Sequence, residues 1–399
     1  MELKMLLSKV KLERFKAAFR PDPIALQKFN VVIGRNGSGK STLLEALQWL
    51  DDTIRYDARH ACDRYFGSED LINFRSRTNL SFFSLELHWS KQNPDFTWHY
   101  NLLVENKNAV PSIYSEKLDY INKKKIKTTF IDTDKNKQRT IKLNDDSNTQ
   151  FPMREPDRLA LSRITGQVDS SLTISPAFLH SFWSNAVFLR LSPNRLAMGS
   201  PSTRKSFEPI LDEEGQMLPS LLNELNVRQR KELVTNLREI LSGMRGVKVT
   251  GAEIGRDSRV HYQLLEQMPY KGRAGKGLFE IPAWMLSEGT RRITAILALL
   301  VHDPLPSLLC IEEIENGLDP WTVRKILNHL QSASDRGTQV IITTHSPWVL
   351  DSVPLDSIIH VRRTGGSTEY LKFSEQEEVK KFNPNIPAGT RYTNISEAR

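Results

Sequence analysis

The sequence is poor in cysteine and has no long apolar run. Its 399 residues include two cysteines, Cys62 and Cys310, which lie too far apart for the close spacing of a zinc site. We expect both to be reduced core residues. No apolar segment approaches the roughly 18 residues of a membrane-spanning helix, and the first residues lack the apolar core of a signal peptide. The sequence therefore predicts a cytoplasmic protein with no membrane partner.

Two further absences limit the architecture. There is no internal repeat, and no segment keeps the apolar heptads of a long coiled coil. The formal net charge of +8 is a mild basic excess, which permits contact with nucleic acid without requiring it. A chain of this length can form two or three ordinary domains or one large bilobed domain.

A phosphate-binding motif is present near the N-terminus. Residues 34–41 match G-x-x-x-x-G-K-[ST], the P-loop pattern, with an apolar strand candidate, Phe29–Ile33, before it and a helical apolar pattern over Thr42–Leu50 after it. In such a loop the backbone N–H groups and the lysine contact phosphates, and the final hydroxyl binds Mg²⁺. The alternative, a glycine-rich turn without a ligand, does not explain the complete match. The predicted nucleotide-binding residues here are Gly34, Asn36, Gly37, Ser38, Gly39, Lys40, Ser41 and Thr42.

Composition divides the chain into four predicted parts. Residues 1–105 alternate like strands around the P-loop, and residues 106–179 form a polar, lysine-rich insertion. Residues 180–280 combine amphipathic helix and strand patterns, and residues 281–399 contain the remaining motifs.

The insertion carries a basic cluster. Lys123, Lys124, Lys125 and Lys127 lie close together, and short β-prone pieces around them predict a hairpin arm. Two interpretations stay open, because such lysines either contact DNA phosphates or form a solvated surface without a ligand.

The C-terminal part begins with a helix start and a strand end that suit nucleotide chemistry. In the segment Leu286–Thr290, Ser287 and Gly289 precede an amphipathic helix, where a serine either binds an anion or acts as an ordinary N-cap. The apolar run from Leu308 ends in Glu312 and Glu313. A carboxylate at such a strand end holds Mg²⁺ through water in P-loop NTPases, and its neighbour can polarise the attacking water. Surface acids that merely end a strand are the alternative.

A turn and a second strand end complete the set. The turn Glu315–Pro320 contains Asp319, and the apolar run from Gln339 ends at His345. A histidine at such a position can hydrogen-bond a γ-phosphate, although an isolated histidine is usually structural. The ordered set of all five motifs favours the functional interpretation.

The order of these motifs resembles the ABC-type P-loop AAA ATPases, and within them the soluble branch that includes RecF-like, SMC-like and OLD-like ATPases. The resemblance covers residues 1–50 and about 280–352 strongly and the segment around 210–280 loosely. It implies an α/β, bilobed fold with a mixed sheet, an antiparallel β subdomain, an inserted arm and no long coiled coil. It also implies ATP and Mg²⁺ as ligands.

The same resemblance implies a homodimer or higher homo-oligomer in which each P-loop faces Ser287 and Gly289 of a second copy. Ser41 and Glu312 would then bind Mg²⁺. The implied catalytic residues are Glu313, as base, and His345, as γ-phosphate sensor, and the turn with Asp319 would couple the two sites. The sequence departs from the wider family in having glutamate at 312, where aspartate is usual, and in offering no clear metal-contacting glutamine.

Three functions compete at this stage. A transporter motor would be shorter and would lack the long insertion. A RecF-like or SMC-like ATPase would act on DNA in repair or recombination. The preferred hypothesis is a slow ATPase that senses DNA and controls a separately encoded nuclease or toxin, because the chain resembles the ATPases of Septu, PARIS or retron anti-phage systems. A binding module with negligible hydrolysis also stays open.

Overall fold

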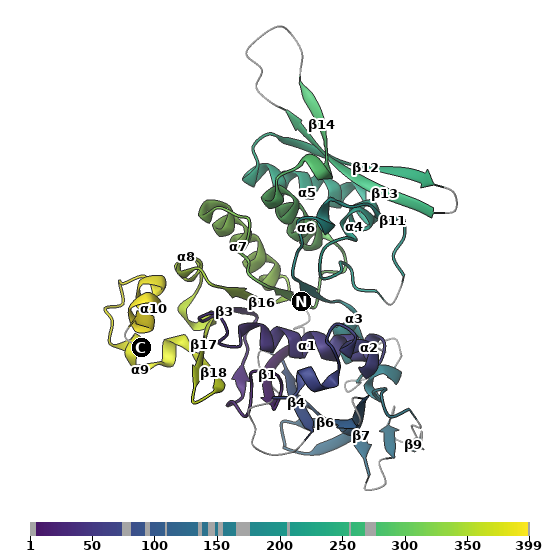
Figure 1. Cartoon of the computed structure of the whole chain (residues 1–399), viewed down its shortest axis with the longest axis vertical. Coiled ribbons are helices and arrows are strands. Elements are labelled where there is room, and N and C mark those ends of the chain that lie inside the picture. The colour runs from purple at the N-terminus through teal and green to yellow at the C-terminus, as the bar shows by residue number, and fades with distance from the viewer. Residues whose placement is uncertain are drawn as a thin grey trace. The chain divides into compact units, whose positions relative to one another are not determined.

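A computed structural model shows two compact units, one formed by Met1–Ser184 with Val353–Arg399 and the other by Asn185–Ser352 (Figure 1). The structure describes residues 5–73, 81–91, 96–107, 110–134, 138–142, 148–150, 155–164, 176–205, 208–254, 257–267 and 277–397.

An antiparallel sheet of eight strands forms most of the first unit (Figure 1). Burial alternates along its third strand, where Phe83, Leu85, Leu87 and Trp89 are buried, as expected for a sheet with one covered face. Four strands between residues 110 and 150 pair one after another and extend the sheet that the N-terminal strands begin. The strand order is β2 (Ile24–Ala25), β1 (Leu6–Glu13), β4 (Phe82–Ser90), β5 (Phe96–Lys107), β6 (Val110–Asn122), β7 (Lys127–Thr133), β8 (Arg139–Lys142) and β9 (Asn148–Gln150).

Helices pack on the buried face of this sheet. Trp49 of α1 (Lys40–Arg55) meets Phe83 edge to face, with ring centroids 5.0 Å apart. Trp183 of α3 (Ala177–Ser184) meets Trp89 in the same way at 6.2 Å. Such pairs contribute about 0.5–1.5 kcal/mol beyond the burial of their area, so they help to hold α1 and α3 against the sheet. Shorter helices are α2 (Ala58–Cys62), η1 (Ser68–Leu71) and η2 (Leu161–Arg163).

A buried polar network ties η2 to the sheet. Glu116 is fully buried and accepts hydrogen bonds from the backbone N–H groups of Ala160 and Leu161, at 2.6 and 2.8 Å, and from the Tyr100 hydroxyl at 3.1 Å. Arg139 is also buried and lies 3.6 Å from Glu116. Because buried charges need such partners, Arg139 supports the fold and does not extend the basic surface of the insertion.

A second set of strands in the first unit carries the P-loop. β3 (Phe29–Ile33) is buried at every residue and pairs in parallel with β17 (Ile358–Thr364), which in turn pairs antiparallel with β18 (Ser367–Lys372). A strand buried on both faces is a near-continuous apolar run, as the sequence predicts for β3. The surrounding helices are η5 (Leu355–Ser357), η6 (Phe373–Glu375), α9 (Glu377–Lys380) and α10 (Ala388–Glu397).

The second unit contains three parallel strands and a separate antiparallel sheet. β10 (Ala186–Leu189), β15 (Leu308–Ile311) and β16 (Gln339–Thr344) are buried throughout and pair in that order. Their carboxyl ends lie at one edge, because parallel strands end at the same side of a sheet. In the antiparallel sheet, β13 (Asp257–Gln267) pairs with β11 (Ser200–Pro201), β12 (Met244–Ile254) and β14 (Leu278–Pro282).

Helices complete the second unit. The apolar pattern over residues 218–241 forms two helices, because Asn226 and Gln229 make a capping box that starts the second one. No described helix is long and apolar enough to cross a membrane, and the longest ones, α1 and α7, have 16 residues each. The helices are α4 (Leu218–Glu224), α5 (Val227–Ile240), α6 (Glu288–Val301), α7 (Pro320–Asp335), α8 (Pro347–Leu350), η3 (Arg195–Ala197) and η4 (Ala283–Met285).

These observations confirm the predicted α/β architecture of two units, with parallel strands and an antiparallel β subdomain. Both cysteines are buried thiols, as expected of core residues.

Candidate functional site

The P-loop connects β3 to α1 in the first unit. Gly37 and Gly39 have φ angles of 72° and 107°, in the left-handed region that glycine adopts without strain. Lys40 is buried, and its Nζ donates hydrogen bonds to the carbonyl oxygens of Gly34, at 2.7 Å, and Arg35, at 3.0 Å. The Lys40 ammonium group therefore contacts the backbone of the loop in which we expect a phosphate to bind.

The loop also has the polar groups and the close-packed backbone that a phosphate-binding turn needs. Ser38 Oγ is buried and has no hydrogen-bond partner among the described residues. A Cβ atom at Gly34 would overlap the carbonyl oxygen of Val361, so only glycine lets the two backbone segments approach this closely. The loop opens directly into the N-terminus of α1, a helix of 16 residues whose first N–H groups attract an anion.

The remaining predicted residues of the loop lie at its rim and in the first helical turn. Asn36 is exposed, Ser41 is half-buried, and Thr42 is buried with its N–H donating to the Gly39 carbonyl at 3.2 Å. Asn36 and Ser41 are thus both accessible to a ligand and its metal ion.

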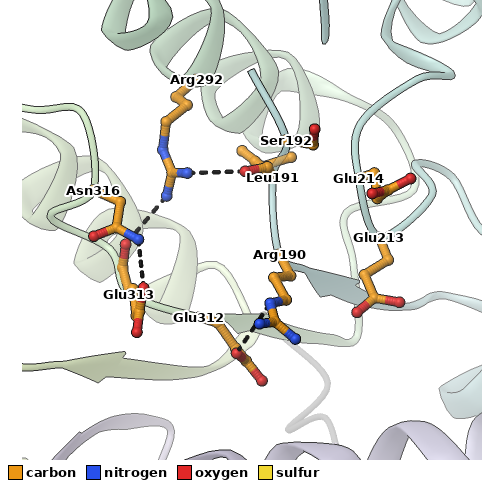
Figure 2. Close-up of a pocket in the computed structure, with 9 residues that line it drawn as sticks. All are labelled: Arg190, Leu191, Ser192, Glu213, Glu214, Arg292, Glu312, Glu313 and Asn316. Atoms are coloured by element: carbon orange, nitrogen blue, oxygen red, sulfur yellow. Dashed lines mark hydrogen bonds and ion pairs between the residues drawn. The ribbon is translucent and has the colours of Figure 1, made fainter. Parts of the chain in front are cut away.

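In the second unit, β15 delivers Glu312 and Glu313 to a polar cavity of about 480 Å³ (Figure 2). The Glu312 N–H donates to the Leu189 carbonyl at 2.8 Å, which continues the parallel pairing beyond the strand. Its carboxylate lies 3.9 Å from Arg190 Nε, and Figure 2 shows the two side chains pointing toward each other. Charged groups therefore meet at the end of β15 in an open, solvated space.

Glu313 has a left-handed backbone with φ of 49°, which costs a non-glycine residue on the order of 1 kcal/mol. Its N–H donates to Thr343 Oγ1 at 2.9 Å, and its carbonyl oxygen accepts from Arg292 Nη2 at 3.1 Å. Arg292 is buried and donates from Nη1 to Leu191 at the same distance (Figure 2). Strain that neighbouring bonds enforce in this way is typical of functional positions.

The Glu313 carboxylate is held by two donors. Asn316 Nδ2 donates to one oxygen, and His345 Nε2 lies 3.1 Å from the other. The hydrogen bond from Asn316, supported by the one from His345, lowers the pKa of Glu313 against the opposing effect of burial. The side chain is 42% exposed, so water can reach it. An ionised, oriented and accessible carboxylate is what a general base requires.

The strand end at His345 is itself anchored. Glu315 accepts hydrogen bonds from the backbone N–H groups of His345 and Ser346, the latter at 3.1 Å. The turn that follows Glu313 therefore fixes the backbone of the histidine that contacts Glu313.

The helix start at Ser287 meets the turn around Gly317. Ser287 is the N-cap of α6, with its Oγ accepting from the Thr290 N–H at 3.2 Å. A Cβ atom at Gly289 would lie 2.6 Å from the Gly317 carbonyl oxygen. The two predicted segments are therefore in direct contact within the second unit, and Ser287 remains exposed.

Asp319 is the N-cap of α7. Its carboxylate accepts from the N–H groups of Trp321 and Thr322, each at 3.0 Å, and the hydrogen bond from the Thr322 hydroxyl lowers its pKa. The structure thus gives Asp319 a role in the helix start, and its predicted role toward a second copy of the chain stays a prediction.

The basic cluster of the insertion lies on a hairpin of the first unit. Lys123, Lys124 and Lys125 form the exposed turn between β6 and β7, and Lys127 begins β7. Lys127 Nζ lies 2.8 Å from Asp119, so part of its charge is neutralised. The predicted hairpin is confirmed, because the β-prone pieces Thr128–Ile131 and Thr140–Ile141 lie in β7 and β8, which pair antiparallel. Contact of the lysines with DNA stays a prediction.

The predicted residues fall into two sets, the P-loop in the first unit and the group of Glu312, Glu313 and His345 in the second. Sequence reasoning missed Asn316 and Arg292 as partners of Glu313. A signal existed for Arg292, because a basic residue that opens an unbroken apolar helical run is expected to need a buried partner. Arg190, an exposed residue after a strand, offered no signal.

Three comparisons with known proteins agree with this geometry. A family model described as "AAA domain, putative AbiEii toxin, Type IV TA system" matches residues 29–351. The Retron Vc95 probable ATPase of Vibrio cholerae is 22% identical over 377 residues, which cover 82% of this chain and 68% of that protein. The cell division ATP-binding protein FtsE of Mycobacterium tuberculosis is 28% identical over 138 residues, or 35% of this chain; the match spans about half, 54%, of that relative.

A solved structure shares the fold. The Smc head domain with a coiled coil and joint derived from Pyrococcus yayanosii superposes with a TM-score of 0.55 and covers 99% of this chain and 100% of that one. The sequence identity is 10%, so the likeness concerns the arrangement of helices and strands alone.

Proposed function

The chain belongs to the AAA domain family described as putative AbiEii toxin, Type IV TA system, and on this premise we propose that it binds and hydrolyses ATP as a conformational switch. The observation that carries the proposal is the Glu313 carboxylate, which Asn316 and His345 hold ionised at the end of β15. The complete P-loop before α1 supports the same function.

The P-loop would hold the triphosphate. Lys40 would exchange its bonds to the Gly34 and Arg35 carbonyls for bonds to phosphate oxygens, and the N–H groups at the start of α1 would face the same charge. The buried Ser38 hydroxyl is placed in the same loop. Each of these groups favours a negatively charged ligand.

Ser41 and Glu312 would hold Mg²⁺, because a hydroxyl and a carboxylate are the hard oxygen ligands that this ion prefers. When bound, Mg²⁺ neutralises the charge that develops on the phosphate oxygens.

Glu313 would act on the attacking water. As the water oxygen bonds to the γ-phosphorus, the carboxylate takes its proton and the bond to the β–γ bridging oxygen breaks, giving ADP and phosphate. His345 would sense the γ-phosphate, and its contact with Glu313 links the base to the presence of the substrate. We expect slow turnover, as suits a switch.

We propose further that ATP closes a head-to-tail homodimer, or a higher homo-oligomer, in which Ser287 and Gly289 contact the nucleotide held by a second copy. The exposed position of Ser287 at the start of α6 supports this arrangement. Hydrolysis would then remove the γ-phosphate that bridges the two copies and open the dimer. The glutamine variant of Glu313 tests this, because it should bind ATP without cleaving it.

The proposed output is control of a separately encoded nuclease or toxin in bacterial anti-phage defence, with DNA as the sensed molecule. The similarity to the Retron Vc95 probable ATPase over 82% of the chain supports this role. Purification of the native protein with its bound partners tests it: an associated nuclease or toxin is expected, and a membrane permease in its place would contradict it.

The alternative is an ATPase that acts on DNA in repair or recombination. The SMC-head fold, with its TM-score of 0.55, and the exposed turn Lys123–Lys125 favour it. A recombination mediator among the associated partners would decide for this function.

A further inference from the structure

We infer that the C-terminal hairpin β17–β18 shapes the phosphate cradle, and that Thr368 and Tyr370 are positioning residues for the nucleotide. The inference rests on the proposed ATP binding of the P-loop and adds two residues, far away in the sequence, to that site.

Three successive carbonyl oxygens of the P-loop each accept a hydrogen bond from a side chain of this hairpin. The bonds run from Arg363 Nη1 to Gly37 at 3.3 Å, from Thr368 Oγ1 to Ser38 at 2.8 Å and from the Tyr370 hydroxyl to Gly39 at 2.9 Å. The hairpin therefore fixes the loop's backbone at three consecutive peptide groups.

Thr368 and Tyr370 are placed for this task by the period of the strand. They are two residues apart on β18, so both side chains project from the same face, and they are 0% and 6% exposed. Buried hydroxyl groups need partners, and the carbonyl oxygens of the P-loop supply them. The same two bonds satisfy the loop's own carbonyl groups away from water.

The consequence for phosphate binding follows from the geometry of the peptide bond. In a trans peptide the carbonyl oxygen and the following N–H point in opposite directions. With the Ser38 and Gly39 carbonyls held toward the hairpin, the N–H groups of Gly39 and Lys40 are directed toward the opposite side of the loop. Backbone N–H groups presented together in this manner form an anion-binding site.

Without the hairpin this orientation would be poorly fixed, because a glycine backbone rotates easily. Gly39 has φ of 107°, and a Cβ atom there would lie 2.5 Å from Thr368 Oγ1. Gly34 packs equally closely on the Val361 carbonyl of β17. Two of the P-loop glycines, Gly34 and Gly39, are therefore required by the hairpin that packs against the loop, whether or not a ligand is bound. A preorganised cradle binds more tightly, because the ordering cost is met during folding.

The test removes single hydroxyl groups. Thr368→Val and Tyr370→Phe keep the shape of each side chain. The first removes the hairpin's donor to the Ser38 carbonyl, and the second leaves the Gly39 carbonyl with the Thr42 N–H but without its bond to the hairpin. The affinity for the non-hydrolysable analogue AMP-PNP, measured by calorimetry, should fall about five- to tenfold in each variant and further in the double variant. Thr368→Ser, which retains the hydroxyl, should bind within about twofold of the unaltered protein. KM for ATP should rise with kcat nearly unchanged.

A purely structural role predicts a different pattern. In one outcome, the melting temperature of the nucleotide-free variants falls while the AMP-PNP affinity of the folded fraction is unchanged. In another, Thr368→Ser binds AMP-PNP as weakly as Thr368→Val does. Either result overturns the inference. The unaltered protein and Lys40→Ala separate this failure from that of the proposed function. If the unaltered protein does not bind AMP-PNP more tightly than Lys40→Ala does, the proposed function fails first.

Discussion

His345 Nε2 lies 3.1 Å from Glu313 Oε1, so the side chain that follows β16 contacts the carboxylate that follows β15. The two strands are parallel neighbours, with Ile311 opposite Ile342, and their carboxyl ends share one edge. A proposed phosphate sensor and a proposed base are therefore coupled before any substrate binds.

Asn316→Ala should move the acid limb of the pH–rate profile to higher pH. The hydrogen bond from Asn316 is the main cause of the lowered pKa of Glu313, because it favours the ionised carboxylate. Without this bond the pKa of Glu313 rises. At mildly acidic pH a larger fraction of the protein then has a protonated Glu313, which cannot accept a proton from water. The measurement is kcat/KM for ATP between about pH 4 and 8. Asn223→Ala, at an exposed asparagine, serves as the control. If the acid limbs of the two variants lie at the same pH, this role of Asn316 is rejected.

Arg292→Met should reduce kcat while leaving nucleotide affinity in place. The guanidinium holds the Glu313 carbonyl, at 3.1 Å, and thereby the strained backbone that directs the carboxylate. Misplacing the base should cost about ten- to a hundredfold in kcat. Arg291→Met is the matched control, since Arg291 donates instead to the carbonyls of Ala283 and Leu286. Equal losses in both variants, or a change in AMP-PNP affinity alone, would contradict the assignment.

The basic hairpin gives a prediction on DNA. Changing Lys123, Lys124, Lys125 and Lys127 together to alanine should weaken duplex binding and flatten its salt dependence, by about 0.9 in the log–log slope for each DNA phosphate that the variant no longer neutralises. Binding is measured by fluorescence anisotropy over a range of salt concentrations. The control removes the same charge from exposed positions elsewhere, namely Lys11, Lys205, Lys231 and Lys381. An unaltered slope in the hairpin variant would make the turn a solvated surface.

Local motifs made much of the site predictable. The P-loop, the two acids after β15 and His345 each follow an apolar strand run. Within the second unit, β15 and β16 are parallel, so the acids and His345 lie at one edge. The contact between His345 and Glu313 was not predicted, because spacing along the chain does not show which side chains meet. The roles of the site residues stay predictions.

Long-range contacts were beyond the sequence. Thr368 and Tyr370 donate hydrogen bonds to a loop about 330 residues earlier in the sequence. A strand that contains a threonine and a tyrosine gives no indication of the segment that these side chains contact. Arg139 belongs to a basic segment by composition, but it is buried beside Glu116. The polar composition after residue 105 concealed strands that continue the sheet, because several residues buried in these strands are themselves polar, namely Glu116, Asp119 and Arg139. The four-part division of the chain stays a prediction.

The most direct test of the switch is the oligomeric state of Glu313→Gln. Analytical ultracentrifugation at saturating ATP and Mg²⁺ should show a stable dimer for this variant, with hydrolysis reduced by at least about a hundredfold, because ATP still bridges two copies and no base removes the proton. Lys40→Ala should stay monomeric under the same conditions. A Glu313→Gln protein that remains a monomer with ATP bound, or that hydrolyses ATP at the unaltered rate, would contradict the account.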